Sequence, residues 1–317
     1  MCDTGNDDSS NTAGSKKFLQ KLKHTKSLLQ RLFYFHQMKN ILLICLLINA
    51  SVANSQSLNV MTFNLRYNNT GDSLNAWTYR KDNAASQILF YNVHLLGVQE
   101  ALNDQMMDLL QRLPKYKTFG GGRDDGKTKG EYSAIFYDSI RLEKLDGAMF
   151  WLSQTPDVPG SKGWDAAITR MVTWCKFKDK QTQKIFFAFN THFDHIGKIA
   201  RAESAKMILQ KVKEIAGLTP VIFSGDFNAT PSDDPIKIIV DPSNPDHLID
   251  SKLISQTPHY GPQGTFNGFE SKEKINGPID HIFIKNNVKV LKHATLSESW
   301  QGRFSSDHFP VFAIVEL

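Results

Sequence analysis

The sequence has little cysteine, and it has no hydrophobic run long enough to cross a bilayer. Three cysteines are scattered over 317 residues, which excludes a disulfide-stabilised scaffold and a cysteine-rich zinc module. The apolar run at 41–48 has only eight residues, whereas a spanning helix needs about 20. Hydrophobic residues make up 41% and charged residues 22% of the chain, so disordered, collagen-like and coiled-coil proteins are also excluded. The composition predicts a globular protein.

The apolar run at 41–48 belongs to an N-terminal leader. It follows Met38 and a single basic residue, and the small residues at 51–53 provide a cleavage position after Ala53. A short basic start, a brief apolar core and small residues before the cut are the pattern of a secretory signal peptide. We therefore expect a secreted or periplasmic mature protein, with no stable membrane insertion after cleavage.

The position of Met38 also predicts the domain boundaries. If translation starts at Met38, the basic region before the apolar run has the short length that is usual for a signal peptide. If translation starts at Met1, that region is 37 residues long, which is unusual. We predict a non-native or disordered extension at 1–37, a signal peptide at 38–55 and one folded domain at 57–317. A genuine amphipathic extension or an uncleaved anchor is the alternative.

Outside the leader, neither sign of charge is in clear excess. Seven of the 37 Lys and Arg residues and three of the 32 Asp and Glu residues lie in 1–55, which leaves 30 basic against 29 acidic residues. A protein that grips long nucleic acid usually has a strongly basic surface. The near-neutral domain disfavours that function, although a local patch such as Arg123, Lys127 and Lys129 keeps it as an alternative.

Predicted strands outnumber predicted helices in residues 57–317. Apolar and alternating runs predict strands at 58–65, 95–99, 133–137, 168–177, 184–190, 221–224, 279–284, 288–296 and 309–315. Helical spacing predicts helices at 80–91, 103–113 and 198–216, with Asn103 capping the second. Because successive strands often lie at hairpin distance, the pattern favours a pair of mixed or antiparallel sheets over a doubly wound parallel sheet.

Six of the apolar runs have polar side chains at one end: Asn64; Glu100; His192, Asp194 and His195; Asp226 and Asn228; Asp280; and Asp307 and His308. Because strand ends gather at one rim of a sheet, we expect these groups to converge. Carboxylate and amide oxygens suit Mg²⁺, Mn²⁺ or Ca²⁺, and histidine beside carboxylate suits acid–base catalysis. A zinc site at His192 and His195 is a weaker alternative. Singly, each motif is more often a turn or a solvated group; together they indicate a functional site.

In their order along the chain, these segments resemble the endonuclease/exonuclease/phosphatase superfamily, which includes pancreatic deoxyribonuclease. The matching motifs are Phe-Asn-Leu-Arg at 63–66, Val-Gln-Glu at 98–100, Asn-Thr-His-Phe-Asp-His at 190–195, Gly-Asp-Phe-Asn at 225–228, Ile-Asp-His-Ile at 279–282 and Ser-Asp-His-Phe-Pro at 306–310. The resemblance covers 57–317, and stretches such as 122–126 and 163–167 resemble secreted bacterial members. It implies an α+β fold: a four-layer α/β sandwich of two packed mixed β-sheets flanked by helices, with the active site at one rim.

The resemblance also implies a metal-dependent phosphoesterase, in which water attacks phosphorus in line with the leaving group. Glu100 would be the principal Mg²⁺ ligand, helped by Asn64 and Asp307, and Mn²⁺ or Ca²⁺ are alternatives. Asp226 and Asn228 would orient the attacking water and hold the phosphate.

The remaining implied roles fall on two histidines and their neighbours. His308 would pair with Asp280, and we expect the strands that carry them to be neighbours in one sheet. His192 would lie against the phosphate, where it stabilises negative charge or protonates the leaving oxygen. Arg170 would contact the phosphate, and Tyr132 is a further candidate for such a contact.

Three functions follow as hypotheses. The near-neutral domain favours hydrolysis of a phosphomonoester or a small phosphodiester by a monomeric enzyme. One alternative is a nuclease, either an endonuclease or a 3′–5′ exonuclease, acting on DNA or RNA. The other is a non-catalytic secreted binding module that has the same fold.

Overall fold

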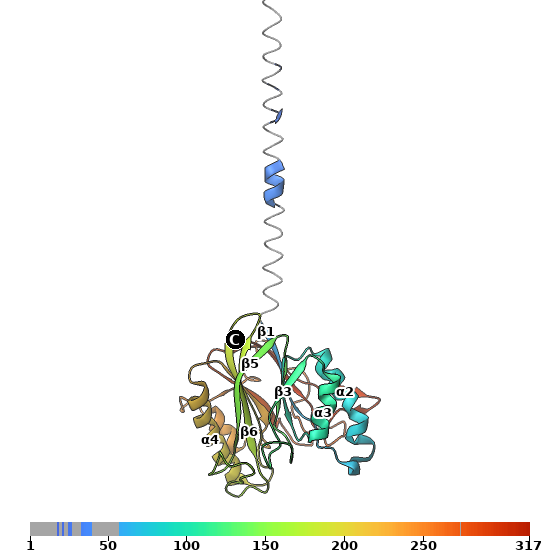
Figure 1. Cartoon of the computed structure of the whole chain (residues 1–317), viewed down its shortest axis with the longest axis vertical. Helices are drawn as coiled ribbons and strands as arrows, with labels where there is room; N and C mark the ends of the chain where they lie inside the picture. The colour runs from blue at the N-terminus through green and yellow to red at the C-terminus, as the bar shows by residue number, and fades with distance from the viewer. Residues whose placement is uncertain (1–17, 19–20, 22–24, 27–32, 40–56, 273) are drawn as a thin grey trace, which may run out of the picture. The chain divides into compact units, whose positions relative to one another are not determined.

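A computed structural model describes residues 57–272 and 274–317, together with parts of the N-terminal segment (Figure 1). The chain divides into two units, Met1–Ser55 and Gln56–Leu317. In the first unit the described residues are helical and exposed: 18, 21, 25, 26 and 33–39.

The predicted leader falls mostly outside the described residues. These do not include 40–55 or most of 1–37, so the signal peptide and the extension stay predictions. Within the part that the structure describes, no helix combines the length and the apolar character needed to cross a bilayer.

Two six-stranded sheets make up the folded unit. The first, in the order β11-β14-β1-β2-β4-β3, contains β1 (Ser57–Asn64), β2 (Leu95–Gln99), β3 (Tyr116–Phe119), β4 (Ile135–Asp138), β11 (Lys289–Thr295) and β14 (Val311–Glu316). The second, in the order β5-β6-β7-β8-β10-β9, contains β5 (Leu142–Trp151), β6 (Met171–Asp179), β7 (Ile185–His192), β8 (Val221–Asp226), β9 (Ile249–Asp250) and β10 (Asp280–Lys285). Both sheets are mixed, because β1–β2 and β7–β8 are parallel pairs among antiparallel ones.

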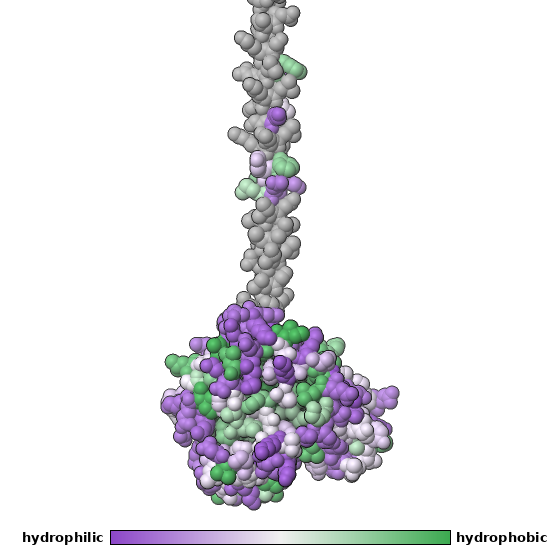
Figure 2. Space-filling view, in the orientation of Figure 1, coloured by the Kyte–Doolittle hydropathy of each residue, from purple (hydrophilic) through white to green (hydrophobic). Residues whose placement is uncertain are grey.

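Helices lie on the outer sides of the two sheets, as Figure 1 shows. The first group comprises α2 (Trp77–Phe90) and α3 (Asn103–Arg112), preceded by the short 3₁₀ helix η1 (Thr70–Asn75); the second comprises α4 (Lys198–Ala216) and α5 (Asp234–Val240). A small hairpin, β12 (Ser299–Trp300) and β13 (Arg303–Phe304), precedes the last strand. The predicted four-layer sandwich is therefore confirmed. Polar residues cover most of the face shown in Figure 2, with apolar residues in smaller groups between them.

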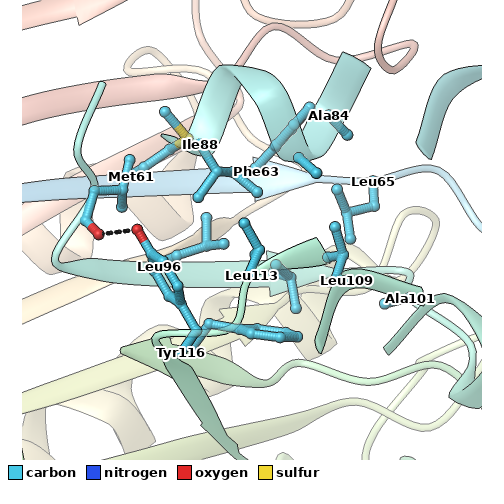
Figure 3. Packing of buried hydrophobic residues seen from close by; sticks show 14 of the residues in the cluster. Met61, Phe63, Leu65, Ala84, Ile88, Leu96, Ala101, Leu109, Leu113 and Tyr116 are labelled. Atoms are coloured by element: carbon cyan, nitrogen blue, oxygen red, sulfur yellow. Dashed lines mark hydrogen bonds between the residues drawn. The ribbon is translucent and has the colours of Figure 1, made fainter. Parts of the chain in front are cut away.

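Strand β1 shows how the sequence builds the layers. Its side chains alternate between the two faces of the sheet. Met61 and Phe63 pack with the helices α2 and α3 (Figure 3), whereas Leu58 and Val60 pack between the two sheets. Truncating a buried phenylalanine such as Phe63 to Ala costs about 3–5 kcal/mol. The same alternation places Asn64 on the face that looks toward the second sheet.

The structure corrects two predictions about local elements. Asn103 does not cap α3, because the cap residue is Leu102, whose N–H donates to Gln105 Oε1 at 3.0 Å. Strand β5 was not predicted, since its exposed and buried positions do not alternate regularly. A register shift between Lys144 and Asp146 interrupts its pairing with β6, and such bulges are common in edge strands.

Candidate active site

The predicted polar groups converge at one rim of the sandwich. Strands β1, β2, β7 and β8 bring Asn64, Glu100, His192 and Asp226 there at or just after their C-terminal ends. Strand β10 runs antiparallel to β8, and its first residue, Asp280, lies in register with Asp226. The strand ends that the sequence singled out therefore form one site.

A cavity of about 350 Å³ opens at this rim, which is within the range of small-ligand sites. Its lining comprises Arg66, Tyr67, Glu100, Glu131, Ile168, Arg170, His192, His195, Asp226, Asn228, Phe266, Ile275, Ile279, Asp307 and His308. Asn64 and Asp280 lie one contact behind it, because Asn64 donates to Glu100 and Asp280 is bonded to His308. The structure does not bring Tyr132 to this lining.

Asn64 links the two sheets. Its amide nitrogen donates to Glu100 Oε1 at 3.0 Å and to Asp226 Oδ2 at 2.9 Å. Its amide oxygen accepts the N–H of Arg66 at 2.9 Å. Because that backbone N–H can only donate, it keeps the oxygen turned away from the carboxylates. Asn64 therefore orients two carboxylates of the cavity, and its role as a metal ligand stays a prediction.

Carboxylates crowd the cavity in the way a divalent cation requires. Glu100, His192 and Asp226 can offer ligand atoms that lie within 4.8 Å of one another. Burial, with a contribution from the Glu100 charge, raises the pKa of Asp307. A cation relieves such repulsion between like charges. The oxygen donors of Glu100, Asp226 and Asp307 fit a hard ion such as Mg²⁺.

His308 and Asp280 form the predicted pair, although not as neighbours in one sheet. His308 Nδ1 lies 2.8 Å from Asp280 Oδ2, and both side chains are buried. Asp280 begins β10 of the second sheet, whereas His308 precedes β14 of the first, so the pair spans the two sheets. Burial opposes protonation of the imidazole, but the Asp280 carboxylate outweighs it and raises the pKa of His308.

His192 lies in the same cavity, but its surroundings shift its pKa in the opposite direction. Burial lowers the pKa of His192, and the positive charges of Arg170 and Arg123 lower it further. Its Nε2 lies 3.0 Å from Asn228 Nδ2, which also donates to the carbonyl of Phe193. Since an amide nitrogen can only donate, Nε2 is the acceptor and the ring is neutral.

Asp226 lies between these two rings. Its Oδ2 is 3.5 Å from His192 Nε2 and 3.9 Å from His308 Nε2, and its Oδ1 accepts the N–H of Asn228 at 2.9 Å. Burial, together with the nearby charge of Asp280, raises the pKa of Asp226. A carboxylate held in this way is suited to take up a proton near neutral pH.

Arg170 is a buried cation with unused hydrogen-bond donors. Its side chain is 5% exposed, and its Nε and Nη1 make no hydrogen bond to any described residue. Its Nη2 lies 3.3 Å from His195 Nδ1, and burial lowers the pKa of Arg170 to about 10. Because unpaired buried donors are costly, this arrangement is suited to binding an anion, and the predicted phosphate contact of Arg170 stays a prediction.

Tyr132 lies elsewhere. Its hydroxyl is 3.0 Å from Asn103 Oδ1 and 2.9 Å from the carbonyl of Lys127, so it secures the loop at 120–130. It is nevertheless close to Arg170, since both line a small void beside the cavity.

The prediction gave no role to two charged residues of the lining, Arg66 and Glu131. Arg66 lies inside the motif at 63–66, so its position in a motif was the available signal. His195, which also lines the cavity, was singled out at a strand end and as an alternative zinc ligand. Glu131 had no such signal, and Arg123 holds it through two bonds of 2.6 and 2.8 Å.

Comparison with known proteins agrees with this geometry. A model of the Endonuclease/Exonuclease/phosphatase family matches residues 61–308. The structure of an endonuclease/exonuclease/phosphatase from Bacteroides vulgatus is similar at 42% identity with a TM-score of 0.79, covering 82% of this chain and 99% of that one. A mannosyl-6-phosphatase from Bacteroides thetaiotaomicron is similar at 38% identity with a TM-score of 0.77, covering 82% and 100%.

A curated relative matches over a shorter stretch. The uncharacterized protein L388 of Acanthamoeba polyphaga mimivirus is 29% identical over 164 residues, which are 49% of this chain and 60% of that protein. This chain therefore spans less than two thirds of that relative. The family match covers well over half of the chain, and it agrees with the two mixed sheets and with the site at their rim. The chain belongs to the endonuclease/exonuclease/phosphatase family.

Proposed function

We propose that this chain is a secreted, Mg²⁺-dependent phosphoesterase that hydrolyses a phosphomonoester or a small phosphodiester by in-line attack of water. The observation that carries the proposal is Arg170, whose buried guanidinium has two nitrogens without a hydrogen-bond partner among the described residues and lines the same cavity as Glu100 and Asp307. An anion position beside clustered carboxylates is what a phosphate ester and a divalent cation together require.

The cavity residues divide the work between them. Glu100 and Asp307 would hold the ion, which when bound supplies positive charge against the phosphoryl oxygens. Arg170 would bind a non-bridging oxygen, and the cationic His308 would stabilise negative charge as it develops. Asp226 would orient the attacking water and take up its proton while the water–phosphorus bond forms and the ester P–O bond breaks.

Two observations support a small substrate. The cavity measures about 350 Å³, and the domain outside the leader has nearly balanced charge, whereas binding to long nucleic acid depends on many basic contacts. The similar structure from Bacteroides thetaiotaomicron is described as a mannosyl-6-phosphatase, which supports a sugar phosphate as the first substrate to test.

The test is a substrate panel assayed with Mg²⁺ and with Mn²⁺. It contains sugar phosphates, nucleotides, inositol phosphates, phospholipids, RNA, and single- and double-stranded DNA, and Glu100→Gln serves as the inactive control. We expect the highest kcat/KM on a small phosphate ester. Faster cleavage of DNA or RNA would favour the nuclease alternative, and no turnover of any substrate would favour the non-catalytic module.

Secretion needs a separate test. Expression from Met38 with N-terminal sequencing of the exported protein should give a mature start between Ala53 and Gln56. A mature protein that still carries residues 1–37 would contradict the proposed signal peptide.

A further inference from the structure

Arg66 is held more rigidly than any role described so far requires. Its backbone has a left-handed φ of 55°, which persists in a bulky residue only where the surroundings enforce it. Its N–H donates to Asn64 Oδ1 at 2.9 Å, and its carbonyl accepts from Gln105 Nε2 at 2.9 Å and from Arg80 Nη2 at 3.1 Å. Three side chains thus fix one backbone unit.

The guanidinium of Arg66 is equally constrained along one edge. Its Nε and Nη2 donate to Asp72 at 3.0 and 3.1 Å, and Asn69 Nδ2 in turn donates to Asp72 at 3.1 Å. The group also lies over the Tyr67 ring, 4.4 Å from its centroid. Its remaining nitrogen, Nη1, makes no hydrogen bond to a described residue, although the side chain lines the cavity and is 25% exposed. The protein therefore holds the Arg66 guanidinium in one orientation, in which Nη1 can still donate to a ligand.

The position of Arg66 complements that of Arg170. Arg66 follows β1 of the first sheet and Arg170 precedes β6 of the second, so each sheet contributes one guanidinium to the cavity. Arg66 Nε is 3.8 Å from Asp307 Oδ2, which places its charge beside the carboxylates that would otherwise repel an anionic substrate. Burial and ion pairing leave neither arginine neutral at physiological pH.

We infer that Arg66 is a second phosphate contact that selects the terminal, dianionic phosphate of a monoester over the monoanionic phosphate of a diester. This deepens the proposed phosphoesterase function and rests on it. A monoester presents three non-bridging oxygens and nearly two negative charges at neutral pH, because its second pKa is about 6. A diester presents two such oxygens and one charge, so a second guanidinium has less to bind.

The test compares two substrates that share one leaving group. We would measure kcat/KM for p-nitrophenyl phosphate and for bis(p-nitrophenyl) phosphate with Mg²⁺, in the wild type and in Arg66→Gln. Losing a charged hydrogen bond lowers monoester turnover about 10–100-fold, and we expect a smaller loss with the diester. Arg112→Gln removes a cation that pairs with Asp82 outside the cavity lining, and as the matched control it should change neither value.

Binding supplies a readout that is independent of turnover. Isothermal titration with inorganic phosphate should show at least about tenfold weaker binding to Arg66→Gln, whereas dimethyl phosphate should bind both proteins alike. Arg66→Lys keeps the charge without the planar fork, so it should retain part of the preference for the monoester. If Arg66→Gln does not fold, a monoester-to-diester ratio in Arg66→Lys equal to that of the wild type overturns the inference.

The outcomes separate this inference from the function on which it rests. A wild type that cleaves neither substrate contradicts the phosphoesterase proposal itself. A wild type that prefers the diester, or an Arg66→Gln variant that loses both activities equally or loses neither, overturns the role of Arg66 and leaves the phosphoesterase intact.

Discussion

Two buried arginines lie beside opposite ends of strand β6, and their hydrogen bonding differs. Arg170 directly precedes β6, whereas Arg141 directly precedes β5 and contacts Asp179, the last residue of β6. At its far end, Arg141 Nε and Nη2 donate to Asp179 Oδ1 and Oδ2 at 2.7 and 2.9 Å, and the side chains are 6% and 1% exposed. Asp179 also accepts from Thr182 Oγ1 and from the N–H of Gln181. At the cavity end, Arg170 is just as buried, but two of its nitrogens have no hydrogen-bond partner among the described residues.

The contrast distinguishes a buried charge that is paired within the fold from a buried charge that is available to bind a ligand. A fully paired ion pair has compensated its desolvation, whereas a buried donor left unpaired is destabilising until something binds it. The carboxylates follow the same division, because Asp179 is fully bonded while Asp280 Oδ1 has no partner among the described residues. The cavity rim thus carries spare hydrogen-bonding capacity.

The largest effect should come from removing the charge that offsets the cation. Glu100→Gln keeps the volume of the side chain but loses the carboxylate, and we expect kcat/KM to fall about 10³-fold. Titration with Mg²⁺ should show weaker binding, while the melting temperature stays near that of the wild type. Full activity in a protein that melts normally would mean that Glu100 is not a ligand.

The two buried arginines beside β6 should then behave as opposites. Arg141→Met leaves Asp179 buried and without its cation, so the free energy of unfolding should drop by about 3 kcal/mol. Arg170→Met removes a cation whose Nε is 3.8 Å from Asp194 Oδ2. Because four backbone N–H groups already donate to Asp194, stability should hold or rise while turnover falls. Urea unfolding measures the stability of both variants, and a phosphatase assay measures their turnover. Equal losses of stability would contradict the proposed difference between Arg141 and Arg170.

A smaller loss of rate should come from the pair of His308 and Asp280. Either His308→Ala or Asp280→Asn should lower kcat about 10²-fold. The double variant should be little slower than His308→Ala alone, because two groups that act as one unit are not additive. Additive losses would show that Asp280 acts through another partner.

The smallest effect concerns pH and lies away from the cavity. Burial, with the charge of Arg141, lowers the pKa of His94 to about 4, and the N–H of Asn59 donates to its Nδ1 at 2.9 Å. The neutral ring is thus favoured by folding, so this contribution is complete above the unfolded pKa of about 6.5 and is lost as pH falls toward 4.

The variant His94→Gln isolates that contribution. The wild type should lose about 2 kcal/mol more of its unfolding free energy between pH 7 and pH 4 than the variant does. Denaturant titrations at both pH values measure the difference. Parallel pH profiles in the two proteins would contradict the assignment to His94.

Local sequence determined most of the fold. Alternation along β1 separates the residues that face α2 and α3 from those that face the second sheet, and the predicted strand at 95–99 and helix at 198–216 match β2 and α4 residue for residue. Strand β5 escaped prediction because it is an edge strand whose pairing is interrupted. Its conformation depends on β6 rather than on its own pattern.

The sequence by itself also determined which residues reach the rim, because a polar group that follows an apolar strand is carried to the strand end whatever lies beside it. Only the tertiary structure decided how those groups act on one another. Asn64 bonds Asp226 across 162 positions of sequence, His308 meets Asp280 across the two sheets, and the surroundings lower the pKa of His192 but raise that of His308. These properties depend on burial and on charges supplied by distant segments, and no local pattern of residues encodes them.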